Sequence, residues 1–101
     1  MRKRTRQLLE EWQFPHIAVG GVTLVHRADW KPCVLRIFNE QCAFHGYEMF
    51  KLFEDNRMQP DMDWSASWSP GTLPTSEEIL AQLYEAPNEM GYVEFLFSKN
   101  F

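Results

Sequence analysis

The stretch Thr75–Ser98 reads TSEEILAQLYEAPNEMGYVEFLFS and carries the clearest local signals in the chain. Glu78 stands three residues after Thr75, which is the spacing of a capping box at the start of a helix. Apolar residues then recur at helical spacing until Pro87, where the pattern ends. Tyr92–Ser98 is predicted to be a strand. Its inner face is expected to carry Val93, Phe95 and Phe97.

The first quarter of the chain predicts a short helix and then extended structure. The helix is expected over Thr5–Gln13, because its apolar residues share one face, and Pro15 stops it. His16–His26 is expected to be extended. Within it, Gly20 and Gly21 form either a two-residue hairpin turn or a bulge in one long strand.

The middle of the chain has weaker patterns. Asp29–Pro32 is predicted to be a turn and Cys33–Phe38 a strand with alternating faces. Cys42–Phe53 fits either a helix or a strand, and Gly46 would mark a bulge in the strand. We favour a strand at residues 42–50, and the helix remains an alternative.

Residues 54–62 are predicted to form a polar loop. The following segment, Asp63–Ser69, alternates strictly between serines on one side and Trp64, Ala66 and Trp68 on the other. This alternation is typical of a half-exposed strand, and it favours a position near the edge of a sheet.

Together these elements predict an α+β fold, with a single antiparallel sheet of about 4–6 strands packed against two helices. The 101 residues are expected to form a single domain, 1–101. Residues 1–6 include four basic side chains and are expected to form a mobile basic arm.

Composition and charge narrow the class of protein. Aromatic residues make up 15% of the chain, more than a small core hides easily, so some rings are expected at an interface. The net charge is −4, but residues 1–40 carry +3 and residues 41–101 carry −7. An acidic surface of this kind favours solubility or a basic partner.

Several locations and ligands are not expected. The basic start is followed by Leu8-Leu9 and then by two glutamates, which is unlike a signal peptide, and no apolar run is long enough to cross a membrane. Two cysteines cannot form a disulfide framework. We therefore expect a cytoplasmic protein with reduced thiols.

Catalytic and cofactor motifs are not recognisable in the sequence. His16, His26 and His45 with Cys42 could ligate a metal, but their spacing matches no metal motif. We assign no catalytic residue, no metal site and no cofactor, and the metal question stays open. The basic arm Arg2–Arg6 could contact phosphates, but the acidic remainder would repel nucleic acid, so direct nucleic-acid binding is not expected.

Aromatic residues among acids point instead to protein recognition. Tryptophan is favoured at interfaces because it buries a large area and loses little rotamer entropy. An edge strand that bears tryptophans and is flanked by carboxylates would suit a partner rich in Lys and Arg. The residues predicted to bind such a partner are Trp30, Glu54, Asp55, Asp61, Asp63, Trp64, Ser67 and Trp68. The alternative is that Trp64 and Trp68 pack under the helix of residues 75–84.

Three pieces of the chain resemble a known family: Asp29–Pro32 leading to Arg36-Ile37, then Ser65–Trp68, then Asn88–Tyr92. In this order they are similar to the immunity proteins of colicins that cleave tRNA anticodon loops. The resemblance covers about a third of the chain. It departs from the family in one respect, since 27 residues separate Ile37 from Ser65 where the family holds the two pieces close.

The resemblance implies a small acidic α+β inhibitor that fills the basic RNA-binding cleft of a nuclease toxin, with toxin-facing residues centred on Ser65–Trp68 and nearby acids. The sequence therefore predicts a non-enzymatic, immunity-type protein. The alternative is a phage or plasmid regulator that binds nucleic acid or a host defence protein. A small metal enzyme is a third hypothesis.

Overall fold

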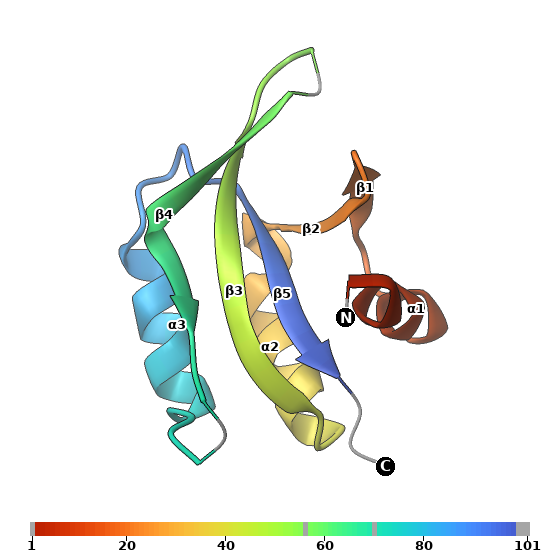
Figure 1. Ribbon diagram of the computed structural model, residues 1–101, viewed down its shortest axis with the longest axis vertical. Helices are drawn as coiled ribbons and strands as arrows, with labels where there is room; N and C mark the ends of the chain where they lie inside the picture. The colour runs from red at the N-terminus through yellow and green to blue at the C-terminus, as the bar shows by residue number, and fades with distance from the viewer. Residues whose placement is uncertain (1, 56, 70, 99–101) are drawn as a thin grey trace.

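A five-stranded antiparallel sheet with strand order β1-β2-β5-β3-β4 forms the centre of the fold (Figure 1). The structure, a computed structural model, describes residues 2–55, 57–69 and 71–98. The elements are α1 (Arg2–Glu11), β1 (Ile17–Val19), β2 (Val22–His26), the 3-10 helix η1 (Arg27–Asp29), α2 (Trp30–Asn39), β3 (Ala43–Leu52), β4 (Met58–Ser67), α3 (Ser76–Glu85) and β5 (Tyr92–Ser98). The predicted α+β class and single antiparallel sheet are confirmed, with a third α-helix.

The third helix, α2, replaces the predicted turn at 29–32 and strand at 33–38, and both of these predictions are wrong. The segment's apolar residues also repeat every three or four positions. The residues of this helical stripe are the ones that are buried: Trp30, Cys33, Val34 and Ile37. Pro32 lies in the first turn, where its missing N–H has no intrahelical partner to lose.

The stretch from Thr75 to Ser98 folds as predicted. The Oγ1 atom of Thr75 accepts the Glu78 backbone N–H at 3.2 Å and caps α3. Strand β5 has the predicted bounds, and its predicted inner residues are buried in the main core: Val93, Phe95 and Phe97. The sequence pattern predicted this stretch correctly because a helix cap and an alternating strand each depend on residues that are close together in the chain.

The extended segment 16–26 is a hairpin. Gly20 and Gly21 have φ angles of +57° and +81°, and Val19 pairs with Val22 across them. A two-residue turn with both central φ angles positive matches the right-handed twist of the strands it joins, and glycine adopts it without strain. The hairpin alternative is therefore confirmed over a bulge in one long strand.

Strands β3 and β4 form a long second hairpin that extends beyond the rest of the sheet at the top of Figure 1. The strand interpretation of 42–50 is confirmed, and the helix alternative is wrong. The predicted loop at 54–62 is wrong from Met58 onward, where β4 begins, and a shorter connection joins the two strands. Polar residues and Pro60 are compatible with this position, since an edge strand leaves one row of backbone groups unpaired.

The main core lies between the sheet and helices α2 and α3, which cover one face of the sheet (Figure 1). Strand β2 pairs with β5 at only two positions, so most of one edge of β5 has no strand beside it. Helix α1 packs there, and the Thr5 hydroxyl donates to the Phe97 carbonyl at 3.1 Å. The helix begins at Arg2 rather than at the predicted Thr5. The side chains of residues 1–4, on which the predicted basic arm depends, lie outside the described residues.

Candidate functional site: the edge strand β4

A large bulge interrupts strand β4 in its middle. Tyr47 of β3 pairs with Ala66, but Met49, two residues further on, pairs with Asp61. The single residue Glu48 therefore faces four residues of β4, 62–65. Bulges bend a strand and redirect its side chains, and they often lie beside functional sites.

Side chains from β4 itself hold the bulge. The Ser65 hydroxyl accepts the Met49 backbone N–H at 3.3 Å and donates to the Asp61 carbonyl at 2.9 Å. The Asp61 carboxylate accepts the Asp63 backbone N–H at 3.0 Å. The extra residues interrupt the hydrogen-bond ladder between β3 and β4. These three bonds take the place of the ladder bonds that are lost there. Side chains within Asp61–Ser65 thus stabilise the local shape.

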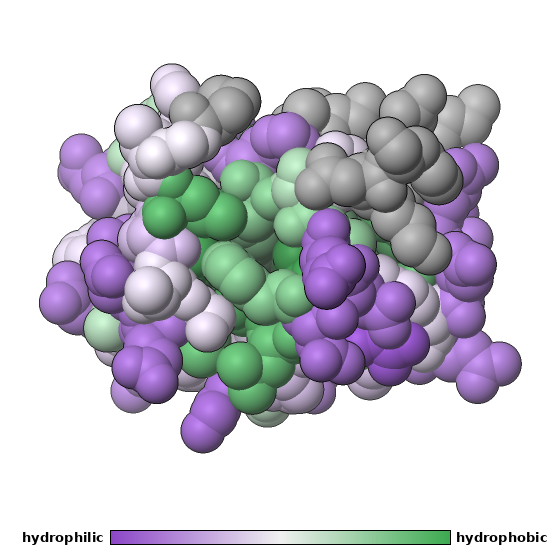
Figure 2. Space-filling model, turned by 90° about the horizontal axis from the view of Figure 1, so that it is seen from below, coloured by the Kyte–Doolittle hydropathy of each residue, from purple (hydrophilic) through white to green (hydrophobic). Residues whose placement is uncertain are grey.

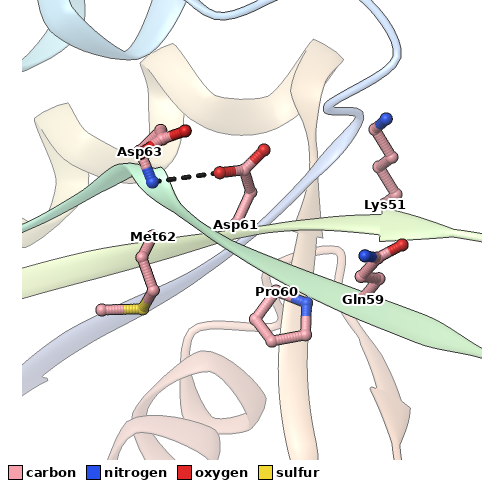
Figure 3. Close-up of a pocket in the computed structure, with 6 residues that line it drawn as sticks. All are labelled: Lys51, Gln59, Pro60, Asp61, Met62 and Asp63. Carbon is pink, nitrogen blue, oxygen red and sulfur yellow. Dashed lines mark hydrogen bonds between the residues drawn. The ribbon is translucent and has the colours of Figure 1, made fainter.

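The bulge presents different chemistry on its two sides (Figure 3). The carboxylates of Asp61 and Asp63 leave the strand on the side of Lys51, while the Met62 side chain leaves on the opposite side. Met62 is 73% exposed. It contributes to two hollows of about 320 Å³ and 190 Å³. The first is lined by Lys51, Gln59, Pro60, Asp61, Met62 and Asp63, and the second by Tyr47, Glu48, Met62, Ser65, Ala66, Ser67 and Leu96.

The charge at this edge is negative after ion pairing. Lys51 is bound at 3.3 Å to Glu89, from the connection after α3, so its charge is already compensated. Among the residues that the structure describes, Asp61 and Asp63 form no ion pair. The bulge therefore keeps two carboxylates available to a cation.

The other two predicted acids lie apart from this pair. Glu54 and Asp55 are at the tip of the β3–β4 hairpin, where Phe53 N–H donates to the Arg57 carbonyl at 2.8 Å (Figure 1). Arg57 also binds the Asp55 carboxylate at 2.6 Å. The predicted acidic site is thus two groups on one hairpin, and Asp55 in the tip group has its own counterion.

The predicted tryptophans have different environments. Trp30 is fully buried, and its indole N–H donates to the Val25 carbonyl at 2.9 Å, so the prediction that it anchors a partner is wrong. Trp64 and Trp68 are half-buried and pack against the main core. The Trp68 ring lies 5.8 Å from both Phe44 and Tyr47.

Each of these environments has a physical reason. Trp30 belongs to the buried stripe of α2. The turn that the sequence predicted at 29–32 would have left it exposed. Trp64 lies on the edge strand β4 and Trp68 directly follows its end. Each ring packs partly against the core, and the rest of the ring stays exposed. Ser67, between them in alternation, is exposed as expected.

Met62 was missed by the sequence analysis. It falls within the predicted polar loop at 54–62, and the predicted alternating strand begins only at Asp63. An apolar residue between two aspartates was the available signal, although an isolated surface methionine needs no special explanation. The exposure of Met62 points to a function only because Met62 lies on the bulge, and the bulge depends on the pairing of β4 with β3.

The structure brings together no group of three or more candidate metal ligands in the described residues. His45 contacts the Ser98 hydroxyl through Nε2 at 2.9 Å. His16 and His26 line one hollow of about 270 Å³, but both use Nδ1 in local backbone contacts, with the Phe14 carbonyl and the Ala28 N–H.

Cys33 is equally unsuited to nucleophilic chemistry. Burial, reinforced by the negative charge of Asp29, raises the pKa of its thiol far above the ordinary value. A thiol attacks substrates and binds metals as the thiolate, so a buried thiol of this kind is inert.

An apolar surface lies at the end of the molecule that is lowest in Figure 1. Apolar side chains gather in its middle and hydrophilic residues surround them (Figure 2). Its elements are the end of α2, the start of β3 and the start of α3 (Figure 1). The paired acids of the bulge belong to the middle of β4, so the charged edge and this surface are different features.

Comparisons of the chain with protein-family models, with curated proteins and with solved structures found no match. In the described residues, no helix is long and apolar enough to cross a membrane. We therefore infer a function from the chemistry of the β4 edge.

Proposed function

We propose that this protein is a non-enzymatic inhibitor of the immunity type, which binds a basic nuclease toxin through strand β4 and blocks its cleft. The observation that carries the proposal is the bulge, which holds Asp61 and Asp63 on one side of an exposed edge. The nuclease as partner comes from the sequence resemblance. The requirement for a basic partner comes from the carboxylates.

The form of the edge favours recognition by side chains rather than by an added strand. Pro60 has no N–H to offer to a new strand, and the bulge at 62–65 breaks the row of backbone groups that such a strand would need. A partner would therefore contact the carboxylates and apolar side chains that project from β4.

Charge dominates the expected kinetics of binding. Two carboxylates without counterions would attract a Lys- and Arg-rich cleft, and such attraction raises the association rate more than it raises the final affinity. The attraction is screened over about 10 Å at 0.1 M salt. We therefore expect fast association that slows steeply as salt is added.

Co-purification of the tagged protein from the cells that produce it tests the proposal. We expect a basic protein at a one-to-one ratio, and we expect its nuclease activity to fall when the tagged protein is added back. The absence of such a partner, or a partner without nuclease activity, would contradict the proposal.

Charge variants then locate the contact. The double variant Asp61→Asn, Asp63→Asn retains oxygen acceptors for the bulge while it removes both charges. A matched control, Glu11→Gln with Glu77→Gln, removes the same total charge from exposed positions on α1 and α3. We expect the first pair to slow association several-fold at low salt and the control to have little effect. Equal slowing would mean that only net charge matters.

A further inference from the structure

Met62 is the most exposed of the large apolar side chains, at 73%, and it belongs to neither buried cluster of the described residues. Its exposure is not a result of strand alternation alone, because the four residues 62–65 lie opposite a single residue of β3. The bulge displaces this segment from the regular ladder. Met62 therefore makes no contribution to the core that would explain its position.

The segment that carries Met62 is fixed before any partner arrives. The Ser65 hydroxyl binds both Met49 and the Asp61 carbonyl, and the Asp61 carboxylate binds the Asp63 N–H. A contact residue on an ordered backbone loses less conformational entropy on binding than one on a flexible loop. The methionine side chain itself is unbranched and polarisable, so it adapts to an irregular apolar pocket.

The two sides of the strand differ in chemistry at this point. Asp61 and Asp63 direct their carboxylates to the side of Lys51, and Met62 projects to the other side (Figure 3). Met62 also borders both hollows along β4, of about 320 Å³ and 190 Å³. A partner whose cleft encloses β4 would contact negative charge on one side of the strand and an apolar side chain on the other.

We propose that Met62 is the apolar anchor of the β4 edge, and that its partner is a basic protein with an apolar socket on one wall of its cleft and Lys or Arg side chains on the facing wall. This inference rests on the proposed function in one respect, that β4 binds a basic protein. Charge complementarity selects this occupant. A second copy of the chain would bring its own Asp61 and Asp63 against the same carboxylates, and nucleic acid or an anionic membrane would be repelled.

Site-specific photo-crosslinking in the producing cells tests the socket directly. The probe is the full chain with Met62→p-benzoylphenylalanine, and the control is Leu35→p-benzoylphenylalanine, at a side chain on α2 that is 44% exposed. We expect the probe at 62 to link to a basic protein, on a peptide where apolar residues adjoin Lys or Arg. No product, a product with nucleic acid or with the chain itself, or the same product from position 35 overturns the inference.

Affinity for the linked protein, purified and measured with Met62→Ala, gives the second arm. Loss of a fully buried methionine contact corresponds to about a tenfold to hundredfold weaker Kd. Leu35→Ala should leave Kd unchanged. Because Met62 lies outside the core, both variants should unfold within about 3 °C of the parent, since exposed substitutions have small effects. An unchanged Kd for Met62→Ala overturns the inference.

The two proposals fail separately. If the linked protein is basic and binding depends on Met62, but the protein is not a nuclease, then the proposed function fails and the anchor stands. If a nuclease is inhibited and Met62→Ala inhibits as well as the parent, the anchor fails and the proposed function stands.

Discussion

The substitution Ser65→Ala tests whether one hydroxyl holds the bulge of β4. The Ser65 Oγ atom accepts the Met49 N–H at 3.3 Å and donates to the Asp61 carbonyl at 2.9 Å. Met49 is fully buried, so its N–H has little access to water when the hydroxyl is removed. The substitution removes a single oxygen atom and leaves the strand otherwise unchanged.

The expected loss of stability follows from the unsatisfied group. A buried donor left without a partner costs about 1–3 kcal/mol. For a chain of this length, each kcal/mol corresponds to about 5 °C in the unfolding temperature. We therefore expect Ser65→Ala to lower the unfolding temperature by about 5–15 °C.

Thermal and urea unfolding, followed by circular dichroism, measure this change. The matched control is Ser67→Ala, which removes an exposed hydroxyl from the same strand. The control should stay within about 0.5 kcal/mol of the parent. If Ser65→Ala is as stable as Ser67→Ala, then the hydroxyl does not hold the bulge, and the argument that Met62 is preorganised loses its basis.

Two further predictions concern the sheet and the core. A Cβ atom at Gly46 would collide with the Ala66 carbonyl oxygen of β4, so Gly46→Ala should destabilise the protein by about 3 kcal/mol or more in urea unfolding, whereas Gly91→Ala, with open space around it, should cost much less. Stability should also fall in alkaline solution, from about pH 9 upward, because folding raises the pKa values of Cys33 and Tyr47 above their ordinary 9.0 and 10.0.

The sign of the alkaline effect follows from proton linkage. Burial, with the charge of Asp29 for Cys33 and of Glu85 for Tyr47, keeps both groups protonated in the folded state. The unfolded chain releases these protons at lower pH, so it binds fewer protons than the folded chain, and its free energy falls relative to that of the folded chain as pH rises. Urea midpoints between pH 8 and 11 measure the effect, and Tyr47→Phe should reduce the slope above pH 10. A midpoint independent of pH in this range would contradict the assignment.

Local sequence patterns predicted the elements whose signals are local. The capping box at Thr75 and the strand 92–98 depend on contacts within a few residues, and both predictions were correct. The two-glycine turn was one of two alternatives, and the structure selects it over a bulge. Helix α2 was missed because its apolar residues satisfy the period of a strand as well as that of a helix. In the folded chain, α2 packs against α3 and β3 and buries its helical stripe rather than alternate residues.

The candidate site was predicted only in part. Asp61, Asp63 and residues 64–67 do lie on one edge strand, and Trp68 directly follows its end. Their division into a bulge and a separate hairpin tip was not foreseeable, because the register of β4 depends on its pairing with residues 43–52. Trp30 was misplaced together with its helix.

The amino-acid sequence by itself determined the α+β class, the acidic second half of the chain and the strands and cap near its end. These properties depend on composition and on short-range periodicity. Only the tertiary structure decided which carboxylates share one side of β4, which tryptophans are buried and that Met62 projects from a bulge. Each of these depends on the register between two strands or on the packing of a helix against a sheet, and such contacts join residues that are far apart in the chain.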